Sequence, residues 1–306
     1  MKKMKNPKVA IIQAEPILFD KEATLNKAIS LIEKASQKQV DLIVFPELFI
    51  PGYPYGMNFG FKIGCRKNSA RADFKRYYDN SISIKSKEID ILEEIAKKVG
   101  AYISIGISEK DENNASLYNT NLIFSPEGKL VYRHRKLKPT GSERLIYADA
   151  NKDYLPILDT EYGKIGSLIC WESYMLLARF ALLKQGISIL IAPNTNDNQE
   201  WQDTIKHIAI EGHIYYINCN MLINKSNYPK NLDEYSEIEK LDENLCRGGS
   251  CIIDPYGHYL TEPVWDKEEI IYAELDMAKV IESRMEFDQC GHYNRSDIFD
   301  FSFKDI

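Results

Sequence analysis

The sequence predicts an α/β fold into which antiparallel strand pairs are inserted, and three observations support this prediction. Short apolar runs typical of strands alternate with stretches of helical period, and the alternation begins again after Gly163. Turn-forming residues at 125–128 and 254–257 each join two strand-like runs, which indicates hairpins. No Pro/Gly/Ser-rich linker or repeat of fixed period divides the chain. We therefore expect a single domain over residues 1–306.

The first half of the chain opens with an expected strand at Val9–Gln13. A helix is expected at Lys21–Ser36, because its apolar residues fall on one helical face. A second helix should lie between Ser86, which is typical of a helix N-cap, and Gly100, which is typical of a helix end. The remaining strands are expected at Leu42–Phe45, Tyr102–Gly106, Leu117–Phe124 and Leu130–Arg133.

The second half repeats this order. Helices are expected at Tyr174–Gln185 and Trp201–Glu211. From about residue 277 we expect a C-terminal extension of the domain. The strands are expected at Ile165–Ile169, Ile187–Ala192, Ile214–Cys219, Ser250–Ile253, Tyr259–Leu260 and Ile270–Leu275.

One segment differs in composition from its surroundings. Asn224–Asn244 carries six acidic residues and three lysines, with few apolar residues. We expect a surface insertion near residues 224–245. The segment is either a solvated loop, or a loop that becomes ordered at a subunit contact or over a pocket.

Composition excludes several classes of protein. The 306 residues include 39 Lys+Arg and 45 Asp+Glu, a formal net charge of −6, which argues against nucleic acid as the main partner. No apolar run approaches the length of a membrane span, and the basic residues 1–5 are not followed by the apolar stretch of a signal peptide. The six cysteines contain no C-x-x-C pair and the five histidines show no ligand spacing. We expect a cytoplasmic protein with reduced thiols, no metal and no cofactor.

Three residues at strand ends have side chains suited to catalysis. Cys170 follows Ile165–Ile169 and precedes an expected helix, whose N-terminus would favour the thiolate. Glu47 follows Leu42–Phe45, where a carboxylate could act as a general base. Lys136 follows another strand and could stabilise a developing negative charge. Each has a plainer interpretation when taken alone: a small buried hydrophobic residue, a solvated loop acid and a basic surface turn.

Taken together and in order, these segments resemble the nitrilase branch of the carbon–nitrogen hydrolase superfamily, over nearly the whole chain from Val9 to Phe303. The downstream pattern looks closer to plant-type and arylacetonitrile-type nitrilases than to carbamoyl-amidases. The matching motifs are Phe45-Pro46-Glu47, Pro51-Gly52-Tyr53-Pro54-Tyr55, His134-Arg135-Lys136-Leu137-Lys138-Pro139-Thr140, Glu143-Arg144, Cys170-Trp171-Glu172, Ala192-Pro193, Trp201-Gln202, Gly248-Gly249-Ser250 and Gly291-His292-Tyr293.

This resemblance implies a four-layer α-β-β-α sandwich with a Glu47–Lys136–Cys170 triad and a second carboxylate at Glu143. We interpret His134, as a neighbour of Lys136, and His292 as structural, and the cysteines other than Cys170 as buried or bystander residues. Further residues are expected to bind substrate, namely Tyr53, Trp171, Glu172 and Asn194.

The reaction implied is hydrolysis of an organic nitrile to a carboxylic acid and ammonia, through a thioimidate and a thioester on Cys170. An amidase would use the same triad on a small amide, and the intact triad argues against a non-catalytic scaffold. The resemblance also implies a homodimer or larger homo-oligomer. The helix expected at Tyr174–Gln185 is apolar on more than one face, which fits either a subunit contact or deep burial within one chain.

The sequence departs from the family pattern at four positions near the expected pocket. Ser173 stands where many nitrilases have His, and Leu176 where they often have Pro. Asn194 stands where Thr is common, and Gly56 where an aromatic residue is common. We expect the missing side chain at Gly56 to enlarge the pocket.

Overall fold

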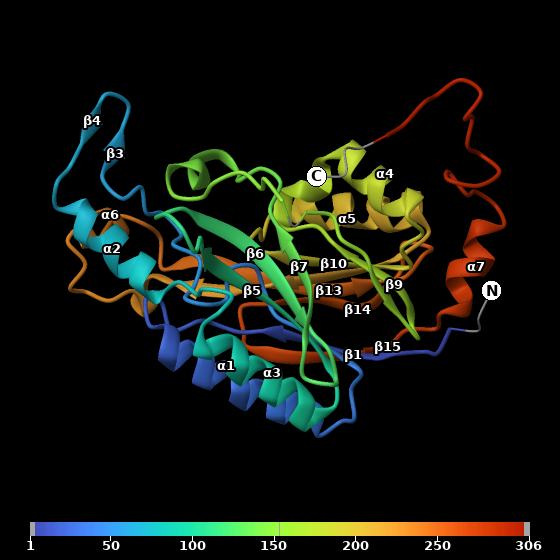
Figure 1. The fold of residues 1–306 in the computed structure, drawn as a ribbon, viewed down its shortest axis with the longest axis horizontal. Coiled ribbons are helices and arrows are strands. Elements are labelled where there is room, and N and C mark those ends of the chain that lie inside the picture. The colour runs from blue at the N-terminus through green and yellow to red at the C-terminus, as the bar shows by residue number, and fades with distance from the viewer. Residues whose placement is uncertain (1–3, 153, 303–306) are drawn as a thin grey trace.

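The computed structural model describes residues 4–152 and 154–302. Residues 1–3 of the basic N-terminal run and Phe303 lie outside the described residues. A first and a second β-sheet lie face to face, and helices cover the outer face of each (Figure 1). This arrangement confirms the expected α-β-β-α sandwich. None of the helices within the described ranges is long and apolar enough to cross a membrane.

The first sheet has the strand order β15-β1-β2-β5-β6-β7. β1, β2 and β5 are parallel, and the other neighbours pair antiparallel. Helices α1 (Lys21–Ser36) and α3 (Lys87–Val99) cover its outer face, as Figure 1 shows. The strands are β1 (Lys8–Gln13), β2 (Leu42–Val44), β5 (Tyr102–Lys110), β6 (Leu117–Phe124), β7 (Leu130–Arg135) and β15 (Glu269–Glu274).

The second sheet has the order β12-β13-β11-β10-β9-β8, with β14 paired to β13. Helices α4 (Leu176–Lys184) and α5 (Gln199–Gly212) cover it, and α7 (Ala278–Arg284) follows β15 (Figure 1). The strands are β8 (Leu158–Thr160), β9 (Gly163–Ser167), β10 (Ile189–Asn194), β11 (Tyr215–Asn220), β12 (Leu222–Asn224), β13 (Asn244–Ile253) and β14 (Tyr259–Trp265).

Alternation along the strands explains why four layers form. Successive side chains of a strand point to opposite faces, so a strand buried on both faces is wholly apolar. On β1, Val9 and Ile11 belong to the core between the sheets, whereas Ala10 and Ile12 belong to the core beneath α1 and α3.

The structure corrects one expected helix. The helix predicted at Tyr174–Gln185 begins only at Leu176, because a 3-10 turn, η2 (Cys170–Tyr174), separates it from the preceding strand. Sequence analysis also missed the hairpin β3 (Phe61–Lys62) and β4 (Cys65–Arg66), and helix α2 (Ala70–Asn80). The hairpin strands are only two residues long, and the buried residues of α2 are only Ala70, Asp73 and Tyr77, one of which is charged.

The acidic segment is folded against the rest of the chain and is not a solvated loop. It contains η3 (Lys225–Asn227) and α6 (Tyr235–Glu239), and it buries Tyr228, Leu232 and Ile238. Figure 1 shows α6 beside α2, and a carboxylate of α2 joins them. The backbone N–H groups of Asp233 and Glu234 donate to Asp73 at 2.9 and 2.8 Å.

Candidate active site

Glu47 lies just beyond β2 and is fully buried. Its Oε1 accepts hydrogen bonds from Lys136 Nζ at 2.7 Å and from Asn119 Nδ2 at 2.6 Å. Its Oε2 has no hydrogen-bond partner among the described residues. The backbone here packs closely on β5: a Cβ at Gly106 would lie 2.4 Å from Pro46 O and 2.8 Å from Glu47 Cα. Only glycine at position 106 therefore leaves room for this approach.

Lys136 joins the two carboxylates of the site. It follows β7, and its Nζ also donates to Glu143 at 2.9 and 3.1 Å. Burial alone lowers the pKa of Lys136, but the charges of Glu47 and Glu143 outweigh burial, and the net pKa is raised. Lys136 therefore carries its charge throughout the physiological pH range.

Glu143 is held by a separate turn, the 3-10 helix η1 (Gly141–Leu145). Its Oε2 accepts from the backbone N–H of Thr140 at 2.8 Å, and its Oε1 from the hydroxyl of Tyr53 at 2.7 Å. The capping contact with Thr140 fixes the carboxylate to its own turn. The second carboxylate expected at position 143 thus lies beside Lys136.

Cys170 is the first residue of η2 and is only 6% exposed. Its backbone has φ +53°, a left-handed conformation that is rare for residues with a side chain. Burial, followed by the charge of Glu47, raises the pKa of Cys170, whereas Lys136 and the backbone N–H of Thr195 lower it. The expected preference for the thiolate at a helix N-terminus is not found, because α4 begins only at Leu176 and burial, the largest influence on Cys170, raises the pKa of its thiol.

Asn119 is a site residue that sequence analysis missed. It lies on β6, is buried, and shares Glu47 Oε1 with Lys136. A carboxylate oxygen only accepts, so the atom of Asn119 that faces it is the donor Nδ2. The signal that could have identified Asn119 is its place in the strand Leu117–Phe124, which is buried along its whole length. A buried amide requires a hydrogen-bond partner.

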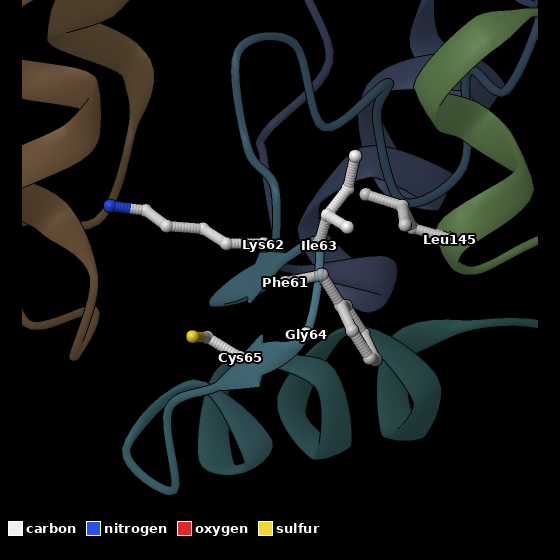
Figure 2. A pocket seen from close by; sticks show the side chains of 6 residues that line it. All are labelled: Phe61, Lys62, Ile63, Gly64, Cys65 and Leu145. Atoms are coloured by element: carbon white, nitrogen blue, oxygen red, sulfur yellow. The ribbon is translucent and has the colours of Figure 1, made fainter.

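A cavity of about 530 Å³ opens beside this cluster, and Tyr53, Trp171 and Glu143 line it. A neighbouring open cavity of about 690 Å³ lies between the β3–β4 hairpin and Leu145, which lines both cavities (Figure 2). The first cavity is mainly apolar and aromatic, and its other lining residues are Pro54, Tyr55, Gly56, Met57, Asn58, Phe59, Thr140, Gly141, Ser142, Leu145, Ile146 and Tyr147.

Glu172, expected to bind substrate, is directed into the protein instead. Its Oε1 accepts from the backbone N–H of Leu137 at 2.5 Å, and its Oε2 from that of Ile169 at 2.6 Å and from His134 Nε2 at 3.0 Å. His134 Nδ1 accepts from the backbone N–H of Leu155 at 3.0 Å, which assigns the ring proton to Nε2. These contacts make Glu172 and His134 structural residues.

Asn194, also expected to bind substrate, is buried and bonded within the second sheet. Its Oδ1 accepts from the backbone N–H of Thr195 at 2.9 Å, and its Nδ2 donates to Asn218 at 3.2 Å. Of the residues expected to bind substrate, Tyr53 and Trp171 line the cavity, whereas Glu172 and Asn194 are not among the described residues that line it.

Two other departures from the family pattern, at Ser173 and Gly56, have local explanations. Ser173 is buried and shares a hydrogen bond of 2.8 Å with the hydroxyl of Tyr216. At Gly56 the expected enlargement of the pocket is not found. A Cβ on Gly56 would lie 2.2 Å from Leu241 Cδ1, so a side chain from the acidic segment already fills that space.

Comparison with known proteins agrees with this geometry. Residues 8–285 match the family model of carbon-nitrogen hydrolases. The chain is 37% identical over 304 residues to a bifunctional nitrilase/nitrile hydratase of Lupinus angustifolius, covering 97% of this chain and 86% of that protein. It is 37% identical over 292 residues to an aliphatic nitrilase of Sinorhizobium fredii, covering 95% and 94%. Nit3 of Saccharomyces cerevisiae, a member of branch 10 of the nitrilase superfamily, has a similar structure, with a TM-score of 0.75 at 25% identity, covering 95% and 97%.

Proposed function

The chain belongs to the carbon-nitrogen hydrolase family and is a hydrolase acting on carbon–nitrogen bonds, and on this premise we propose that it hydrolyses organic nitriles to carboxylic acids and ammonia. Identity of 37% to proteins named as nitrilases, over nearly the whole chain, supports the choice of substrate. The observation that carries the proposal is the Glu47 carboxylate. One of its oxygens is bonded to Lys136 and Asn119, the other has no partner among the described residues, and the charge of Glu47 acts on the thiol of Cys170.

In the proposed first step, Glu47 Oε2 takes the thiol proton of Cys170 while Sγ bonds to the nitrile carbon. A π electron pair of the C≡N bond moves to nitrogen, which receives the proton back from Glu47, and a neutral thioimidate results. The pKa directions fit this transfer. Burial is the largest influence on Cys170 and on Glu47, and it raises the pKa of both groups. In this proposal the thiol is therefore protonated before the reaction, and Glu47 is a stronger base than an exposed carboxylate.

In the following steps, Glu47 or Glu143 activates a water molecule that adds to the thioimidate carbon. Ammonia leaves and a thioester remains, which a second water molecule hydrolyses to the acid and the free thiol. One nitrile and two waters thus give one acid and one ammonia. The ammonium group of Lys136, and the backbone N–H of Trp171, stabilise negative charge that develops at the reacting centre.

Ammonia release tests this proposal. The substrates are aliphatic, aryl and arylaceto nitriles beside their matching amides, with Cys170→Ala as the blank. We expect the wild type to turn over nitriles. Cys170→Ala should show no turnover and an unchanged far-UV circular dichroism spectrum, because the nucleophile is lost while the fold is kept.

Cys290→Ala is the matched control, since Cys290 is a free, half-buried cysteine of the C-terminal segment. It should keep wild-type turnover. Turnover of amides alone would identify an amidase with the same cluster. Wild-type turnover by Cys170→Ala would remove Cys170 from the mechanism.

We also propose that the protein forms a homodimer through an apolar patch around η2 and the start of α4. The proposal is supported by the exposure of these large side chains, which a single copy leaves in water. Two edge-to-face ring contacts at this end of η2 order the aromatic part of the patch: Trp171 with Tyr174, and Tyr174 with Trp201. The exposed fractions are 46% for Trp171, 49% for Tyr174, 40% for Met175, 59% for Leu176 and 67% for Leu177.

A further inference from the structure

The cavity wall contains a position without a side chain. Gly56 lines the cavity and is exposed, and its backbone has φ +75°. Glycine adopts this left-handed conformation without strain. A side chain that packs against this bare stretch of backbone therefore supports the cavity wall here.

Leu241 of the acidic segment lies directly against this stretch of backbone. The three atoms nearest to an ideal Cβ on Gly56 all belong to this one side chain, at 2.2 Å for Cδ1, 3.4 Å for Cγ and 3.6 Å for Cδ2. The isobutyl group of Leu241 therefore occupies the volume that a side chain at position 56 would need.

Hydrogen bonds hold Leu241 in place from both sides. Its carbonyl oxygen accepts from Lys225 Nζ at 2.8 Å, and its backbone N–H donates to Ile238 O at 3.0 Å. The hydroxyl of Tyr228 donates to the carbonyl oxygen of Tyr55, the neighbour of Gly56, at 2.8 Å. The acidic segment is thus tied to the strip of chain that forms the cavity wall.

Two contacts with α2 and the chain before it anchor the same segment. Asp73 is 3% exposed and accepts the two backbone N–H groups that precede α6. Glu234 pairs with Lys67 at 2.7 Å and accepts from Ser69 Oγ at 2.8 Å. With these anchors, Leu241 does not retreat freely when a substrate presses on Gly56.

We propose that Leu241 is a specificity-determining residue, which limits the length of the substrate by supporting the cavity wall at Gly56. This inference rests on the proposed function for its substrate class, the nitriles. Leu241→Ala removes three carbons that pack against position 56, so that this part of the cavity wall, which has no side chain of its own, can yield to a longer substrate.

The test is the ratio of kcat/KM for long over short unbranched nitriles, from propanenitrile to octanenitrile. One methylene in an apolar pocket is worth about 10-fold to 200-fold in discrimination. We expect Leu241→Ala to raise the ratio by about 10-fold or more. Leu232→Ala is the matched control, because Leu232 is a buried leucine of the same segment and supplies none of the atoms nearest Gly56. It should leave the ratio unchanged.

A double-mutant cycle tests the contact without any substrate. Gly56→Ala introduces a clash with Leu241, and Leu241→Ala removes it, so the double variant should melt at a higher temperature than additivity of the single variants predicts. An unchanged ratio, or the same shift from Leu232→Ala, would overturn the inference. Absence of nitrile turnover by the wild type would contradict the proposed function instead. In that case the ratio of kcat/KM for long over short substrates would be measured on amides, provided that the protein turns them over. If it does not, the double-mutant cycle of melting temperatures would decide whether Leu241 packs against Gly56.

Discussion

At the scale of single residues, the site depends on which oxygen of Glu47 is free. Asn119 and Lys136 both bond to Oε1, and Oε2, which has no partner among the described residues, is the oxygen proposed to take the thiol proton. The hydrogen bond from Asn119 also lowers the pKa of Glu47, which burial raises. Asn119→Leu should therefore raise that pKa, so that the acid limb of kcat against pH moves to higher pH. We expect kcat to fall by about 10-fold to 100-fold, part of what a positioned base contributes. KM should change little, since Asn119 is not among the described residues that line the cavity. Asn121→Leu is the control. Asn121 is a buried amide on the same face of β6 and donates to Ser167 at 3.0 Å. An unmoved acid limb, or an equal shift in the control, would show that Asn119 is merely structural.

At the scale of elements, the catalytic cluster requires the turn that carries Cys170 to be fixed against the segment that carries Lys136. Glu172 makes this connection, because its carboxylate accepts from Ile169 in one segment and from Leu137 and His134 in the other. In Glu172→Gln, an NH₂ group replaces one of the two carboxylate oxygens. This donor then faces a backbone N–H or His134 Nε2, which is also a donor. We expect a loss of about 1–3 kcal/mol in the free energy of unfolding, the cost of unsatisfied buried groups, and a fall in kcat. Urea unfolding measures the free energy of unfolding, and steady-state kinetics measure kcat. If Glu172 instead bound substrate, KM would rise while the urea midpoint stayed at its wild-type value.

At the scale of the whole molecule, the apolar patch around η2 is the surface proposed to pair two copies. Asp in place of both Leu176 and Leu177, which are 59% and 67% exposed, would bring charge into an apolar contact. We expect light scattering at micromolar concentration to give the mass of a dimer or larger assembly for the wild type and of a monomer for this double variant. Ile281→Asp is the control, since Ile281 is 45% exposed on α7 and lies outside the patch. A monomeric wild type, or dissociation by the control as well, would contradict the proposed interface. Trp171 belongs both to this patch and to the cavity wall, so the monomeric variant should also show altered substrate preference.

The sequence by itself identified the residues of the cluster, and its resemblance to a known family implied the four layers. Val9 to Ile12 alternate between two cores, and this pattern depends only on strand geometry, which local residues dictate. The sequence identified the cluster because each of its members follows a strand in a recognisable motif, namely Glu47, Lys136 and Cys170. The structure places Glu47 and Lys136 in contact.

Only the tertiary structure decided how these groups act on one another. The resting state of the thiol depends on burial and on carboxylates far away in sequence, which no local pattern reveals. The same holds for Asn119 beside Glu47 and for Leu241 behind Gly56, pairs separated by 72 residues in the first case and by most of the chain in the second. Glu172 lies in the expected catalytic motif but is directed inward, where its carboxylate accepts from the backbone N–H groups of Ile169 and Leu137. Motifs thus specify which side chains are present, whereas long-range packing specifies the direction, protonation and neighbours of each one.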